Sequence, residues 1–146
     1  MVYLLMQKNT RSTDLRSKLK TMETKEHVFK EHEENMELAG KIDFYKVEIR
    51  NLRTILSDIS KEIQLKNELL ELEHLQNQLD IQENHANYIS HTIRNDEKRI
   101  DSIFDAKVSI PTDSKSHQKS KDLVSSFERN FRELRHEIGN FTSKVS

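Results

Sequence analysis

The chain has 146 residues, of which 34% are hydrophobic and 34% are charged, and its formal net charge is −1. Globular domains usually hold about 45–50% apolar and about 25% charged residues, so this composition argues against a compact core. Two glycines and one proline are too few for the turns of a sheet protein, which leaves long helices with few connections. The near-zero charge excludes a global attraction to nucleic acid, and the lack of cysteine excludes disulfides and cysteine-based zinc sites.

The first 40 residues are predicted to form an N-terminal helical segment with split charge. The chain starts with apolar residues where a signal peptide has basic ones, and this stretch is too short to span a bilayer. Residues 1–22 hold five basic residues and one acidic residue, whereas residues 23–37 hold six glutamates and two lysines. A solvated helix and electrostatic docking with a partner or an antiparallel copy both explain this split. An imperfect heptad line, interrupted by Glu26 and Glu33, consists of Leu15, Leu19, Met22, Phe29 and Met36.

A regular apolar pattern follows over residues 42–63, after a change of phase near Gly40 that indicates either a hinge or a tolerated glycine. The steps between its apolar residues alternate between three and four, which is the a/d pattern of a coiled coil. The stripe is narrow, as is typical of a seam between helices. We predict a partner-binding seam formed by Ile42, Tyr45, Ile49, Leu52, Leu56, Ile59 and Ile63. Changing Ile49, Leu52 and Leu56 to alanine is expected to abolish partner binding.

The seam is predicted to continue with slips of register through Leu69, Leu72, Leu79, Ile89, Ile93, Ile100 and Ile103. In this interpretation Gln76 and Glu83 occupy seam positions. Because no proline precedes Pro111, one long coiled-coil helix is predicted over residues 41–107. Polar residues interrupt the seam at Lys66, Glu83 and Asp96. A self-copy would bring these residues face to face, so we expect a hetero-oligomer in preference to a homodimer.

Pro111 disfavours helix at the residue before it, and we place a linker at residues 108–117 and an amphipathic helix at residues 118–146. Its predicted docking face is made of Val124, Phe127, Phe131, Leu134, Ile138, Phe141 and Val145. So many large apolar residues must be buried, because exposed they would make the helix adhesive. The helix either folds back beside residues 80–107 or joins a bundle with other chains, and we favour other chains.

No motif in the sequence indicates catalysis, and we expect no catalytic residue, no cofactor and no metal. Two Glu-x-x-His steps occur, from Glu71 to His74 and from Glu133 to His136, and this step supplies ligands in di-iron bundles. So many glutamates and histidines produce two such steps by chance, and the second lies off the apolar line. A glycine-rich phosphate loop is lacking, and the basic stretches carry no aromatic residues for stacking on nucleic acid.

The sequence therefore predicts an all-α, elongated coiled-coil protein without enzymatic activity. We expect an intracellular scaffold subunit, in the cytoplasm, on the cytoskeleton or in the nucleus, that assembles with partner helices. Complexes of cytoskeletal, kinetochore, centrosomal or vesicle-tethering type use such subunits. One alternative is a bundle on a membrane surface that inserts the C-terminal phenylalanines. Another is a partly disordered chain that folds on binding.

Overall fold

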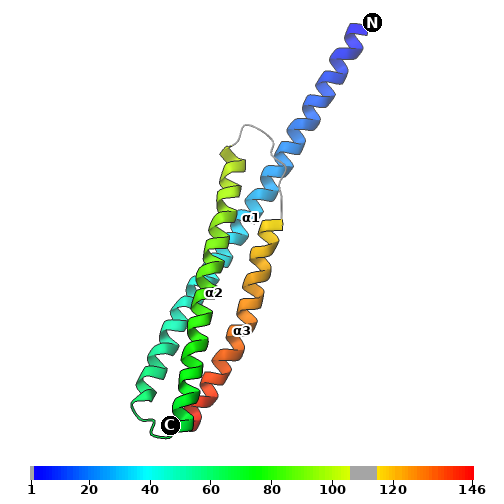
Figure 1. Ribbon diagram of the computed structural model, residues 1–146. Coiled ribbons are helices and arrows are strands. Elements are labelled where there is room, and N and C mark those ends of the chain that lie inside the picture. Colours follow the sequence, from blue (N-terminus) through cyan, green and yellow to red (C-terminus); the bar gives the residue numbers. More distant parts are fainter. Residues whose placement is uncertain (1, 106–114) are drawn as a thin grey trace.

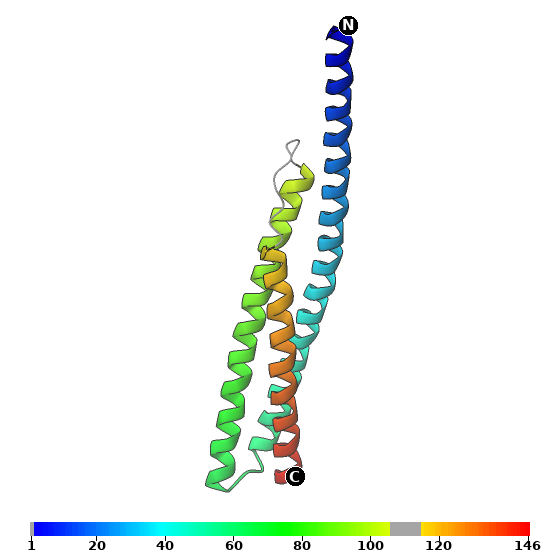
Figure 2. The same ribbon diagram turned by 90° about the vertical axis from the view of Figure 1, so that its right-hand side faces the viewer.

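Three long helices pack against one another in a computed structural model that describes residues 2–105 and 115–146, without the side chains of residues 2–13 and 21. The helices are α1 (Val2–Ser60), α2 (Lys66–Asp105) and α3 (Lys115–Val145). Helix α2 runs antiparallel to α1, and α3 returns in the direction of α1 (Figures 1 and 2). The prediction of an all-α fold is confirmed, since every element of the described residues is a helix.

Each helix turns one regular line of side chains into a common core. Buried positions recur at alternating steps of three and four residues in all three helices, and this spacing keeps one face of an α-helix toward its neighbours. In α1 the line consists of Val28, Glu31, Asn35, Ile42, Ile49 and Leu56, with Leu38, Tyr45, Leu52 and Ile59 partly buried between them. In α2 it consists of Leu72, Leu75, Leu79, Gln82, Ala86, Ile89, Ile93, Asp96, Ile100 and Ile103. In α3 it consists of His117, Ser120, Val124, Phe127, Phe131, Leu134, Ile138 and Phe141.

The prediction of one helix over residues 41–107 is wrong, because the chain turns back at residues 61–65. The amide of Glu62 donates to the carbonyl of Ile59 at 2.9 Å, which tightens the end of α1. Ile63, at the centre of the turn, is buried against the core. No proline or glycine marks this turn, so its cause is tertiary. Two apolar faces on one chain gain more by packing on each other than by facing water.

The register predicted for the start of α2 is also wrong. Leu75 and Gln82 are buried, whereas Gln76 is exposed and Glu83 is only partly buried. Leu69, which we assigned to the seam, is exposed. The core line of α2 therefore has no slip. The apparent slips arose because exposed Leu69 was taken as a seam residue and because polar Gln82 occupies a core position.

Helix α3 packs on the chain's own α1 and α2, whereas we favoured packing with other chains. The rings of Phe127 and Phe131 lie 5.4 and 5.1 Å from the ring of Tyr45 in α1, both edge to face. Such aromatic contacts stabilise beyond their buried area. The predicted linker at 108–117 falls mostly outside the described residues, and its last three residues belong to α3.

Helix α1 is longer than the bundle it helps to form. Its N-terminal part extends beyond the ends of α2 and α3 as a single helix (Figures 1 and 2). Every described side chain from residue 14 to 20 is exposed, and the core line begins only at Val28. The helix passes through Gly40 without a break, as the interpretation of a tolerated glycine predicts. None of the described helices is long and apolar enough to cross a membrane.

Candidate functional site

Four polar residues occupy core positions near the end of the bundle from which the single helix emerges. They are Glu31 and Asn35 of α1, Asp96 of α2 and His117 of α3, and all four are buried. Each one takes the place of an apolar residue in the alternating pattern of its helix. A buried polar group costs stability unless its hydrogen bonds are made, so the contacts of this cluster decide its role.

Asp96 is the centre of the cluster and is 2% exposed. Its Oδ2 accepts from Nδ2 of Asn35 at 2.9 Å, and its Oδ1 accepts from Nε of Arg99 at 2.8 Å and from Oγ of Ser116 at 2.7 Å. Burial by itself raises the pKa of Asp96, but the hydrogen bonds from Arg99, Asn35, Ser116 and His117 outweigh it and lower the pKa to about 2. Asp96 is therefore an ionised acceptor that connects all three helices.

His117 lies between carboxylates of the other two helices. Its Nδ1 is 3.0 Å from Oδ2 of Asp96, and its Nε2 is 2.8 Å from Oε2 of Glu34. The hydrogen bond from His117 lowers the pKa of the Glu34 carboxyl against the opposing effect of burial, with a further contribution from Lys121. The ring thus joins α3 to both α1 and α2.

The cluster contains a possible set of metal ligands, because ligand atoms of Glu31, Asp96 and His117 all lie within 4.8 Å of one another. The guanidinium of Arg99 already bonds to both carboxylates, at 2.9 Å to Oε2 of Glu31 and 2.8 Å to Oδ1 of Asp96. A cation at this point would have to displace Arg99 and would lie beside its charge. The arrangement is better suited to aligning three helices than to binding a metal ion.

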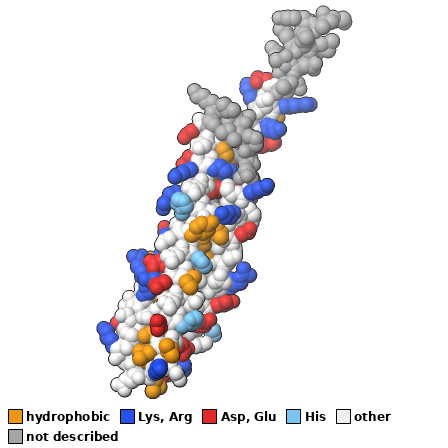
Figure 3. All heavy atoms as spheres, viewed as in Figure 1, with side chains coloured by type: hydrophobic (Ala, Val, Ile, Leu, Met, Phe, Trp, Pro, Cys, Tyr) orange, Lys and Arg blue, Asp and Glu red, His pale blue; other side chains and the backbone are white. Residues whose placement is uncertain are grey.

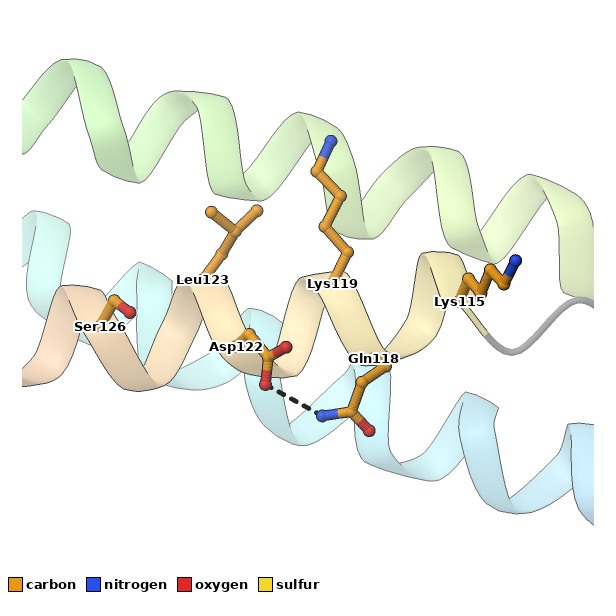
Figure 4. A pocket seen from close by; sticks show the side chains of 6 residues that line it. All are labelled: Lys115, Gln118, Lys119, Asp122, Leu123 and Ser126. Atoms are coloured by element: carbon orange, nitrogen blue, oxygen red, sulfur yellow. Dashed lines mark hydrogen bonds between the residues drawn. The ribbon is translucent and has the colours of Figure 1, made fainter.

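An open hollow on the surface of α3 gives no sign of a catalytic cleft. It is lined by Lys115, Gln118, Lys119, Asp122, Leu123 and Ser126. Figure 4 shows that Lys119 and Leu123 extend toward α2, while Gln118 donates a hydrogen bond to Asp122 at 2.9 Å. These side chains point in different directions, so the hollow does not bring reactive groups together.

Helix α1 also carries a second apolar face, on the side away from the core. We call it the outer face, and its eight side chains, 44% to 63% exposed, are Leu15, Leu19, Met22, Phe29, Met36, Phe44, Val47 and Ile55. At about 100° of turn per residue, these positions fall within roughly 60° of one line along the helix. From Leu15 to Val47 this line lies away from the core line, whereas Ile55 borders the core-side residues Leu52 and Ile59. On the face of the bundle seen in Figure 3, hydrophobic side chains form only small patches among charged ones.

The structure places most residues of the predicted partner-binding seam inside the chain's own core. Ile42, Ile49, Leu56 and Ile63 are buried, and the three residues between them, Tyr45, Leu52 and Ile59, are partly buried. The predicted residues of α2 are buried except for Leu69. The predicted face of α3 is buried except for Val145, which is partly buried. These residues contact other helices as predicted, but the helices belong to the same chain.

Two features were missed by sequence reasoning. Glu31 and Asn35 continue the core spacing of α1 upstream of Ile42. Both are polar, whereas the outer line in the same stretch is apolar, so the sequence indicated the outer line as the buried one. From the sequence we identified the outer line only up to Met36. Its continuation through Phe44, Val47 and Ile55 was missed, because the regular spacing of apolar core residues from Ile42 onward is the stronger pattern in that part of α1.

Comparisons of the chain with protein-family models, with curated proteins and with solved structures gave no match.

Proposed function

We propose that this protein is a non-enzymatic assembly subunit that docks onto other protein helices through the outer face of α1. The observation that carries the proposal is that α1 has two apolar faces, of which the three-helix core uses only one. A helix at the surface of a bundle normally has a polar side toward water. An exposed apolar line of this length, even with the interruptions at Glu26 and Glu33, is typical of a surface that binds another protein.

The length of α1 supports this proposal. With 59 residues at 1.5 Å each, the helix is roughly 90 Å long, and its outer face follows most of that length. A long helix with one free face suits the joining of components that lie far apart. We therefore keep the proposal of an intracellular complex of cytoskeletal, kinetochore, centrosomal or vesicle-tethering type.

The reason for preferring a different chain over a self-copy does not hold in this fold. Glu83 pairs with Arg53 of α1, and Asp96 is satisfied by groups of all three helices. Lys66 is exposed at the start of α2. Glu83 and Asp96 thus have partners within the chain, and Lys66 faces solvent, so these polar residues do not require a different chain as partner. A self-copy is as acceptable as a different protein.

The alternative of a membrane-surface bundle loses the residues on which it depended. Phe127, Phe131 and Phe141 are buried in the core and face α1 and α2, so they do not form an exposed apolar face for a membrane. Inserting them would require the bundle to open. We do not pursue this alternative.

The proposal is tested by placing charges on the outer face. The variant Leu19→Glu with Met36→Glu changes two exposed residues, so we expect its helicity and unfolding midpoint to match wild type. Exposed residues of α2 give the matched control, Leu70→Glu with Ile81→Glu. Tagged full-length chains are compared by size-exclusion chromatography of extracts from cells that express them. We expect the α1 variant alone to leave the larger complex, and an unchanged elution of this folded variant would contradict the proposal.

A further inference from the structure

We infer that the N-terminal part of the outer face, over residues 14–37, pairs with the same segment of a second copy of this chain in antiparallel orientation. This inference rests on the proposed function and names the partner for one part of the docking surface. The segment includes the single helix beyond the bundle and the first turns that touch α2 and α3, so a second copy can approach it along its whole length (Figures 1 and 2).

Charge is divided between the two halves of this segment. Residues 14–22 carry the exposed basic residues Arg16, Lys18 and Lys20 against one exposed acid, Asp14, an excess of two positive charges. Lys8 and Arg11 extend the basic half in the sequence. Residues 23–37 carry two exposed lysines, Lys25 and Lys30, and four exposed glutamates, an excess of two negative charges. The four exposed glutamates are Glu23, Glu26, Glu33 and Glu37.

The remaining two glutamates of the acidic half are used within the chain. Glu31 is buried and bonds to Arg99, and Glu34 bonds to His117 and Lys121. The other four glutamates of this half are exposed, and Glu26 and Glu33 lie on the outer line itself. In the basic half, Lys18 lies 3.6 Å from Asp14 of the same helix, and both side chains stay exposed, so they are accessible to a second copy.

Orientation follows from this distribution. A parallel copy would place basic half on basic half and acidic half on acidic half, which is repulsive at both ends. An antiparallel copy places each basic half along an acidic half, and opposite charges across two helices fix partner and direction. The same arrangement explains why Glu26 and Glu33 interrupt the apolar line of Met22, Phe29 and Met36. In an antiparallel pair the glutamates meet the basic half of the partner.

Apolar contacts supply the attraction that the charges direct. Leu15, Leu19, Met22, Phe29 and Met36 are more than half exposed in the single chain. Pairing with a copy would cover ten such side chains, five from each molecule, in one closed symmetric interface. The antiparallel orientation would place the two bundles at opposite ends of a longer rod. Each core would stay intact, because the paired segments touch through the outer face and not through the core face of α1.

A pair of complementary charge variants of the full chain tests this inference. The all-acidic variant carries Arg16→Glu, Lys18→Glu and Lys20→Glu, and the all-basic variant carries Glu23→Lys, Glu26→Lys and Glu33→Lys; all six residues are exposed. Exposed basic residues of α2 and α3 give the control of equal charge change, Lys98→Glu with Arg129→Glu and Arg132→Glu. Circular dichroism establishes that each chain is helical with an unchanged unfolding midpoint.

Sedimentation equilibrium then measures the mass of each purified chain across the micromolar range. We expect wild type and the control to approach twice 17.3 kDa and each charge variant to remain near 17.3 kDa. An equimolar mixture of the two charge variants is expected to regain the double mass. A wild-type chain that stays monomeric, or charge variants that associate like wild type, would overturn the inference. The proposed function is judged separately, because a monomeric chain that still enters a larger cellular complex through the outer face keeps that proposal intact.

Discussion

At the scale of single residues, the buried polar cluster aligns the helices at a cost in intrinsic stability. Asp96, Asn35 and His117 lie where apolar side chains would pack, and Oδ2 of Asp96 accepts from Asn35 and lies 3.0 Å from Nδ1 of His117. A shift of one helix by one core position would leave an ionised carboxylate buried without partners, which is strongly unfavourable. The cluster therefore selects one register among several that an apolar core of regular spacing would tolerate.

Replacing Asp96 by asparagine should reveal this role. Asp96→Asn removes the charge that accepts from Arg99 and Ser116 and places an amide among hydrogen-bond donors. We expect the free energy of unfolding, measured in urea, to fall by roughly 3 kcal/mol. The matched control is Asp101→Asn on the same helix, where the side chain is exposed, and its effect should lie within about 0.5 kcal/mol. Equal effects of the two substitutions would show that the cluster contributes little.

The lowered pKa of Asp96 predicts a dependence of stability on acid. The pKa is about 2 in the folded chain, below its ordinary value of 3.8, so folding favours the ionised form. The resulting stability is present above pH 4 and is lost as the pH falls through about 2. Its size is on the order of 2 kcal/mol. Urea unfolding of wild type and Asp96→Asn at intervals from pH 5 to pH 2 should show a steeper loss for wild type, and parallel curves would contradict the assignment.

At the scale of the helix, α1 is distinguished by its two apolar faces. One closes the bundle with α2 and α3, and the other remains toward solvent. Ile49 and Ile55 make the distinction concrete, because the same residue type in the same helix is 1% exposed at one position and 44% exposed at the other. The two faces explain the change of phase near Gly40, where the apolar pattern passes from the outer line to the core line without any break in the helix.

Alanine substitutions at these two isoleucines separate the faces. Ile49→Ala leaves a cavity in the core and should lower the free energy of unfolding by roughly 2–5 kcal/mol. Ile55→Ala removes an exposed side chain and should change it by at most about 0.5 kcal/mol. Chemical denaturation of the two variants side by side gives the comparison. For the same reason, the triple alanine variant of Ile49, Leu52 and Leu56 is now expected to unfold the bundle. A loss of partner binding by this variant would then reflect unfolding and would not identify these residues as the interface.

The sequence predicts those features of the helices that depend on local residue spacing, and it does not predict those that depend on contacts between helices. The 3-4 spacing of Ile42 to Ile63 and of Val124 to Phe141 predicted helices with buried faces, and those faces are buried. The turn at residues 61–65 could not be predicted, because no residue there disfavours helix and the turn depends on packing between α1 and α2. Asp96 was predicted to interrupt the seam, but the rest of the polar cluster escaped prediction, because Glu31 and Asn35 resemble surface residues until their positions in the core spacing are known.

At the scale of the whole molecule, the three helices form a core within one chain and leave apolar side chains of α1 exposed on its outer face. Several ion pairs connect the helices along the surface, such as Arg135 with Glu48 at 3.2 Å and Lys144 with Glu71 at 2.7 Å. Exposed pairs of this kind contribute little, about 0–1 kcal/mol each, so the apolar core and the buried cluster hold the bundle together. The outer face of α1 takes no part in that core.

The most direct test of this account measures whether α3 packs on α1 of the same chain. Because the chain has no cysteine, spin labels can be attached uniquely at Asn51→Cys in α1 and Glu137→Cys in α3, both exposed and near the contact of Arg135 with Glu48. Double electron–electron resonance is recorded after the doubly labelled chain is unfolded and refolded in an excess of unlabelled chain. A bundle closed within one chain predicts a single short distance, that between labels on two neighbouring helices, and this distance survives the dilution. Loss of the short distance on dilution would show that α3 packs on another molecule and would contradict the account.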